Sequence, residues 1–156
     1  MIRETAIETF IDLLKQGNSA ELSAIGYSMF PTLRPGDKAL IKPFNNNKPA
    51  VPGIIIVARR DNTLVMHRLI EISKDATGNT EYVTRGDSTT ENDPSWQADQ
   101  IIGLVEYCNR KGKKHKIKTT PLSKLNYRNH RRYLWLHSKF KKYLGRSPDN
   151  INICIV

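Results

Sequence analysis

Gly26-Tyr27-Ser28-Met29-Phe30-Pro31-Thr32-Leu33, followed by Arg34-Pro35-Gly36-Asp37, is the stretch from which the fold can be predicted. Gly26 lets the backbone turn and approach a bound molecule closely. Pro31 restricts its own φ and that of Phe30, and the last four residues have the composition of a turn. A nucleophilic serine needs an exposed hydroxyl on a fixed backbone, close to a base and to N–H donors. Ser28 is therefore a candidate nucleophile, although a serine in a turn is more often structural.

Two further segments carry residues that could act with this serine. His67 and Arg68 lie in Val65-Met66-His67-Arg68-Leu69-Ile70, within an expected strand. A histidine titrates near neutral pH and can serve as a general base, or it can be a strand residue satisfied by its neighbours. The other segment is a polar loop that, taken alone, is typical of a solvated turn: Thr84-Arg85-Gly86-Asp87-Ser88-Thr89-Thr90-Glu91-Asn92-Asp93-Pro94.

Together the three segments resemble the signal peptidase I superfamily, which includes the self-cleaving repressors of the LexA type. Ser-Met-x-Pro-Thr-Leu with a following Gly-Asp turn resembles its nucleophile box. The His67–Arg68 pair resembles the archaeal and endoplasmic-reticulum type of signal peptidase, whereas bacterial members carry a lysine at this position. The polar loop resembles the Gly-Asp-Asn box, with Ser88 in place of the usual Asn, and Asp93 matches the acid that ends the box in His-type members.

The resemblance implies a catalytic triad of Ser28 as nucleophile, His67 as general base and Asp93 as the acid that orients the histidine. Asp87 is interpreted as a loop-fixing residue, with the alternative that it orients His67 instead. The Ser28 N–H is the expected oxyanion donor, because the residue two before the nucleophile is Gly26 and lacks the hydroxyl of some members. The supporting residues implied are Gly26, Met29, Pro31, Arg68, Gly86, Asp87 and Ser88.

The resemblance covers about residues 24–106 and implies a mainly β fold, a coiled β-sheet or partly open barrel, which the pattern also favours. Strands are expected at 21–26, 38–42, 53–59, 64–73, 81–85 and, as the last, 101–109, with a hairpin joining 53–59 to 64–73. Apolar residues at helical spacing predict an amphipathic helix over 2–16, ended by Gly17. The predicted organisation is a helix at 1–20, a peptidase core at 21–109 and a basic, helical tail at 110–156.

The charge of the chain is concentrated in this tail. Residues 1–106 hold 11 Lys/Arg against 14 Asp/Glu, whereas residues 107–148 hold 14 Lys/Arg and no acidic residue. Basic and aromatic residues alternate over 123–144 and predict a helix or a helix pair. Three interpretations stay open: a helix packed on the body, peripheral contact with an anionic membrane or acidic peptide, and nucleic-acid binding, which no recognition motif supports.

The function predicted is that of a serine endopeptidase that cleaves an extended peptide or precursor protein after a small residue. The alternatives are an inactive peptidase fold that binds a peptide, an anionic membrane or nucleic acid, and a protein that cleaves only itself. No cofactor or metal is implied, and Cys108 and Cys154 are expected to be free thiols. No run reaches the roughly 18 apolar residues that span a bilayer, and residues 1–12 do not resemble a secretory signal, so a cytoplasmic location is expected.

Overall fold

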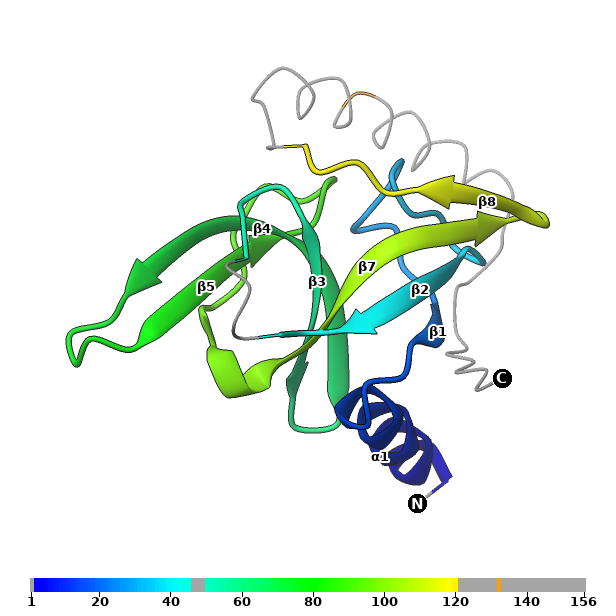
Figure 1. Ribbon diagram of the computed structural model, residues 1–156. Helices are drawn as coiled ribbons and strands as arrows, with labels where there is room; N and C mark the ends of the chain where they lie inside the picture. The colour runs from blue at the N-terminus through cyan, green and yellow to red at the C-terminus, as the bar shows by residue number, and fades with distance from the viewer. Residues whose placement is uncertain (1, 46–49, 121–131, 133–156) are drawn as a thin grey trace.

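An antiparallel sheet and one α-helix make up the described part of the protein in a computed structural model, which describes residues 2–45, 50–120 and 132 (Figure 1). The sheet has eight strands within these residues. In chain order the elements are α1 (Ile2–Lys15), β1 (Ala20–Ser23), β2 (Lys38–Pro43), β3 (Ile55–Arg60), β4 (Thr63–Lys74), β5 (Thr80–Arg85), β6 (Trp96–Gln97), a 3-10 turn η1 (Ala98–Gln100), β7 (Ile101–Arg110) and β8 (Lys113–Lys116).

The strands follow the order β1-β2-β7-β3-β4-β5-β6, and β8 pairs with β7. Every pairing is antiparallel. The prediction of a mainly β fold with an N-terminal helix is confirmed, and the sheet is open, because β1 and β6 end the path without pairing with each other. Figure 1 shows the long β4–β5 hairpin reaching away from the body and α1 lying near the β3–β4 turn.

The predicted hairpin is confirmed as β3 and β4, which pair from Ile55↔Arg68 to Arg60↔Thr63. The two-residue turn between them begins at Asp61, whose φ is 53°. An aspartate tolerates this left-handed conformation better than most residues, which suits a tight hairpin turn. This hairpin places His67 and Arg68 in the middle of β4.

The helix is held by the apolar face that the sequence predicted. Ile7, Phe10, Ile11 and Leu14 are buried in a first core cluster, together with residues of β1, β2, β3 and β7. The helix ends as expected at Gly17, whose φ is 85° and whose N–H donates to the Leu14 carbonyl at 3.0 Å.

Strand β3 separates this first cluster from a second one. Ile55 and Val57 belong to the first cluster, whereas Ile56 and Ala58 belong to the second, beside Trp96. A strand that is buried on both faces explains the continuous apolar run in its sequence. Cys108, on β7, is a buried free thiol of the first cluster, and Cys154 lies outside the described residues.

The prediction that 101–109 holds the last strand is wrong. Lys111 and Gly112 adopt φ angles of 50° and 78° and form a two-residue turn, which pairs β8 with β7 from Arg110↔Lys113 to Tyr107↔Lys116. The beginning of the segment expected to be a helical tail is therefore part of the sheet. The strand β6 was also not predicted, because two residues are too short to show a pattern.

The basic helix expected over 123–144 lies outside the described residues, apart from Arg132, which is helical and exposed. Within the residues that the structure describes, no helix is long and apolar enough to cross a bilayer.

Candidate active site

Ser28 lies in the connection between β1 and β2, on a backbone fixed from both sides. The Phe30 N–H donates to the Tyr27 carbonyl at 3.0 Å, and the Leu33 N–H donates to the Met29 carbonyl at 2.9 Å. The side chains of Met29 and Leu33 are buried in the first core cluster. These hydrogen bonds and buried side chains hold the segment against the core, and the Ser28 hydroxyl points toward β4.

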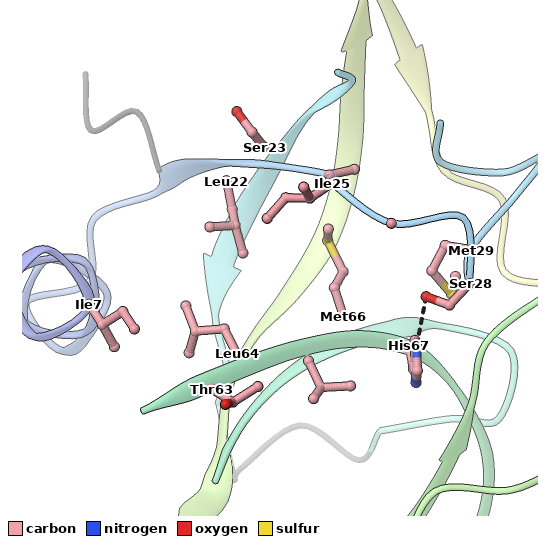
Figure 2. Close-up of a pocket in the computed structure, with 13 residues that line it drawn as sticks. Ile7, Leu22, Ser23, Ile25, Ser28, Met29, Thr63, Leu64, Met66 and His67 are labelled. Atoms are coloured by element: carbon pink, nitrogen blue, oxygen red, sulfur yellow. Dashed lines mark hydrogen bonds between the residues drawn. The ribbon is translucent and has the colours of Figure 1, made fainter. Parts of the chain in front are cut away.

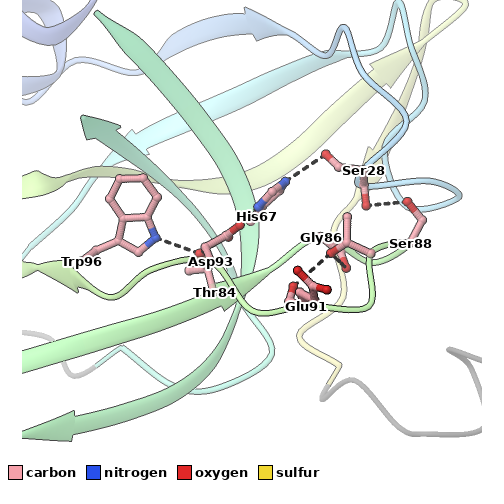
Figure 3. Close-up of polar contacts among 9 residues, drawn as sticks. Ser28, His67, Thr84, Gly86, Ser88, Glu91, Asp93 and Trp96 are labelled. Carbon is pink, nitrogen blue, oxygen red and sulfur yellow. Dashed lines mark hydrogen bonds and ion pairs between the residues drawn. The ribbon is translucent and has the colours of Figure 1, made fainter. Parts of the chain in front are cut away.

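His67 joins Ser28 to Asp93 (Figure 3). Its Nε2 lies 2.9 Å from the Ser28 Oγ, and its Nδ1 lies 2.6 Å from Asp93 Oδ2. Both distances are those of hydrogen bonds, as a nucleophile, a base and an orienting acid require. The side chains of His67 and Asp93 are 15% and 21% exposed, so the pair is shielded but not sealed. The structure thus brings together the three residues that the resemblance implies.

The Asp93 carboxylate is held in its charged form. Its burial raises the pKa, but hydrogen bonds from His67 and Thr84 and the nearby positive charge of Arg60 outweigh this effect and lower the pKa below the ordinary aspartate value. An ionised carboxylate only accepts hydrogen bonds, so the proton of the neutral imidazole lies on Nδ1. The Nε2 lone pair is then free to accept the proton of Ser28.

The Asp87 carboxylate is hydrogen-bonded to Arg68 and not to His67. The Arg68 Nε and Nη2 donate to its two carboxylate oxygens at 2.6 and 2.7 Å, and Arg68 Nη1 donates to the Gly53 carbonyl at 2.6 Å. Thr32, from the nucleophile segment, also donates to Asp87. The Arg68 and Asp87 side chains are only 5% and 3% exposed. Asp93 is therefore the acid that orients His67, and Asp87 ties its loop to β4 and to the nucleophile segment.

Gly86 and Ser88 hold this loop directly against Ser28. The Ser88 N–H donates to the Ser28 carbonyl at 2.8 Å, and the Ser88 hydroxyl lies 2.6 Å from the Tyr27 carbonyl. A Cβ at position 86 would lie 2.7 Å from the Ser28 carbonyl oxygen, so only glycine fits there. Ser88, which departs from the Asn of the resembling family, still binds the nucleophile loop through its own N–H and hydroxyl.

Gly26 differs from its expected role. Its φ is outside the left-handed region, and an added Cβ would meet no atom closer than the Ser28 nitrogen at 4.0 Å. The turn at the nucleophile therefore does not require a glycine there, and the absence of a side chain leaves open space beside Ser28. The Ser28 N–H stays the candidate oxyanion donor. Pro31 follows Phe30 through a cis peptide bond.

Four residues support the site through contacts that the sequence does not predict. Thr84 donates to Asp93, and Trp96 donates to Thr84. Asp37, at the end of the nucleophile segment, forms a bidentate pair with Arg110, which also donates to the Thr32 carbonyl at 3.1 Å. Burial raises the Asp37 pKa, and the Arg110 and Arg34 donors more than offset this and lower it. These partners lie up to 78 residues from one another in sequence, so no local pattern shows that they meet.

An apolar pocket opens beside Ser28 and His67 (Figure 2). Its volume is about 250 Å³. One wall is the edge of β4 from Thr63 to His67, which precedes the β5 pairing that begins at Arg68. The pocket is lined by Ile7, Leu22, Ser23, Ala24, Ile25, Gly26, Ser28, Met29, Thr63, Leu64, Val65, Met66 and His67. It therefore offers a strand edge and apolar side chains next to a candidate nucleophile.

Across residues 2–45 and 50–120, no group of three or more His, Cys, Asp or Glu side chains is placed to hold a metal ion. Comparisons with known protein families, with curated proteins and with solved structures find nothing that matches this chain.

Proposed function

We propose that this protein is a serine endopeptidase of the signal peptidase type, with Ser28, His67 and Asp93 as its catalytic triad. The observation that carries the proposal is the unbroken hydrogen-bonded series from the Ser28 hydroxyl through both nitrogens of His67 to Asp93. This series lies at one end of an apolar pocket. A base with one nitrogen on a serine and the other on a buried carboxylate is the arrangement that activates a serine for attack.

In the proposed mechanism, His67 Nε2 takes the proton of the Ser28 hydroxyl as Oγ attacks the carbonyl carbon of the scissile peptide bond. The Ser28 N–H stabilises the oxyanion, and Asp93 stabilises the imidazolium. His67 then gives its proton to the leaving amine, the C–N bond breaks, and an ester joins the acyl group to Ser28. Water attacks this ester with its proton passing to His67, and the released Ser28 oxygen recovers that proton.

The substrate proposed is a peptide in extended conformation, paired with the edge of β4 that lines the pocket. Thr63 to His67 spans about 13 Å, so a paired strand would place alternate side chains about 7 Å apart along the pocket. Met29 lies beside Ser28, and Met66 lines the pocket farther from it, so the space next to Ser28 is reduced (Figure 2). This crowding supports a small residue before the cleaved bond, with apolar side chains farther from it.

The proposal is tested by incubating a diverse peptide library, including Ala-x-Ala sequences, with the wild-type protein and following cleavage by mass spectrometry. Ser28→Ala is the inactive variant. Ser23→Ala is the matched control, because Ser23 lines the same pocket on β1 while His67 bonds to Ser28. Cleavage by wild type and Ser23→Ala but not by Ser28→Ala is expected. Equal cleavage by all three proteins would overturn the assignment.

The β7–β8 hairpin favours a second candidate function, namely binding of an anionic membrane surface without catalysis. Its turn and outer strand carry Lys111, Lys113, Lys114, His115 and Lys116, all exposed. Such a cluster attracts acidic lipid headgroups by about 1 kcal/mol for each Lys or Arg near the surface. Salt-sensitive co-sedimentation with phosphatidylglycerol vesicles, combined with no cleavage of any library peptide, would favour this function over the peptidase.

A further inference from the structure

The hydrogen-bonded series of the site continues beyond Asp93 into the core (Figure 3). The Thr84 hydroxyl donates to Asp93 Oδ2 at 2.5 Å, on the same oxygen that His67 Nδ1 contacts. The Trp96 indole Nε1 then donates to the Thr84 hydroxyl at 2.8 Å. Thr84 and Trp96 are 1% and 3% exposed, so water does not compete for these bonds.

The chemistry of the three groups sets the direction of this series. An indole N–H is a donor only, so the Thr84 oxygen must accept from Trp96. The single proton of the hydroxyl is then directed at the Asp93 carboxylate, which can only accept. A second bond, from the Asp93 N–H to the Thr84 carbonyl at 2.8 Å, fixes the backbone of Asp93 beside the same residue. Thr84 therefore holds both the main chain and the carboxylate of Asp93.

Trp96 is itself held in place by the short strand β6 and by Arg60. Trp96 pairs with Tyr82 in the sheet, and the Arg60 guanidinium lies 4.4 Å from the centre of the indole ring. Arg60 also donates to the Ser95 carbonyl at 2.8 Å. These contacts fix the indole on the side of Thr84.

We propose that Thr84 and Trp96 are positioning residues, which aim the Asp93 carboxylate at His67 and keep its Nδ1 bond formed. This inference rests on the proposed peptidase function for its rate effect, but not for its structural part. Both residues act through Asp93, and the pocket that would hold the substrate is lined by other residues.

The test removes one donor at a time. Thr84→Val keeps the shape of the side chain and deletes the hydroxyl, whereas Thr84→Ser retains the hydroxyl. Trp96→Phe removes the indole N–H that directs the Thr84 hydroxyl toward Asp93. Thr80→Val is the matched control, since it makes the same change at the other end of β5, opposite Lys74. Thermal melts and circular dichroism establish which variants are folded at the assay temperature.

Thr84→Val is expected to lower kcat about tenfold and Trp96→Phe about threefold, in line with a lost charged and a lost neutral hydrogen bond. KM is expected to stay at the wild-type value, because neither residue lines the pocket. Thr84→Ser is expected to restore most of kcat, and Thr80→Val to leave it unchanged. If Thr84→Val does not fold, the kcat of Trp96→Phe tests the positioning role instead, with the same threefold decrease expected.

A proton NMR measurement tests the positioning without a substrate. The proton shared by His67 Nδ1 and Asp93 should give a resolved signal far downfield in wild type, which disappears in Asp93→Asn. We expect this signal to weaken or exchange faster in Thr84→Val and Trp96→Phe and to persist in Thr80→Val. A signal and a kcat that are unchanged in both folded variants would overturn the inference. A wild type that shows the signal but cleaves no peptide would instead contradict the peptidase function alone.

Discussion

His67 and Arg68 are neighbours on β4, and each is paired with an aspartate of the loop that follows β5. The His67–Asp93 pair is partly exposed and touches the Ser28 hydroxyl. The Arg68–Asp87 pair is almost completely buried and touches Thr32, four residues farther along the nucleophile segment. Because successive side chains of a strand point to opposite faces, two adjacent residues reach the same loop on different sides.

The two pairs differ in what their protons can do. An arginine keeps its protons in proteins, so Arg68 always donates to Asp87 and this pair can only fix geometry. A histidine can gain and lose a proton near neutral pH, so His67–Asp93 can take part in chemistry. The Arg68–Asp87 pair fixes the loop and the Ser28 segment relative to β4. The His67–Asp93 pair is thereby held at hydrogen-bond distance from the Ser28 hydroxyl. Four experiments should separate these two roles.

The largest expected effect is that of His67→Ala. Removal of the general base should lower kcat by about 10⁶-fold, as found for serine peptidases whose residues act as a unit. The free energy of unfolding should fall by about 1–2 kcal/mol, because the substitution also removes a hydrogen bond to the Asp93 carboxylate. Peptide cleavage and denaturant unfolding measure the two quantities. A His67→Ala protein that cleaves at the wild-type rate would eliminate His67 as the base.

The next effect compares one substitution in the two aspartates. Asp93→Asn should lower kcat about 10⁴-fold, because the amide cannot stabilise the imidazolium, and it should cost less stability than Asp87→Asn. Asp87→Asn should instead lower the free energy of unfolding by about 3–5 kcal/mol, because it leaves the buried Arg68 charge unpaired. Parallel kinetics and urea unfolding of both variants provide the measurement. The opposite assignment, with Asp87→Asn folded normally but inactive, would show that Asp87 orients His67.

A smaller effect is expected where the loop touches the nucleophile. In Gly86→Ala the new Cβ would lie 2.7 Å from the Ser28 carbonyl oxygen and 3.0 Å from Ser28 Cβ, so the two segments must move apart. A displacement of this size should lower kcat about 10²-fold. Gly26→Ala is the matched control, since its Cβ meets nothing closer than 4.0 Å. Equal activities of the two variants would argue against a tight contact at Ser28.

The smallest effect concerns pH. The pKa values of Asp93 and Asp37 are lowered in the folded protein, through donors that outweigh burial. Such carboxylates stabilise the fold above their unfolded pKa of about 3.9, and this stability is lost as pH falls through the folded pKa. The thermal midpoint of the wild type should therefore fall below about pH 4. The difference in thermal midpoint between the wild type and Asp37→Asn should shrink over the same pH range. A difference that stays constant would contradict the role of the Asp37–Arg110 pair.

Much of the secondary structure could be predicted from the sequence, because its signals are local. Three features could be predicted from a few neighbouring residues each: the buried face of α1, the apolar run of β3 and the turn at Asp61. β6 could not be predicted, since two residues carry no period. β8 was not predicted because residues 110–156 were assigned to a basic, helical tail, whereas the positive φ angles of Lys111 and Gly112 turn the chain back onto β7.

The sequence by itself determined the candidate residues of the site, because the three segments that hold Ser28, His67 and Asp93 together resemble the boxes of one superfamily, although none is decisive alone. Only the tertiary structure decided which aspartate faces His67, since Asp87 and Asp93 belong to one loop. Asp93 bonds to His67 of β4, whereas Asp87 bonds to Arg68 of the same strand. The tertiary structure also decided the supporting contacts of Thr84, Trp96 and Arg110. The physical reason is that burial and hydrogen-bond partners arise from segments far apart in the chain, and these set the charge and direction of each group.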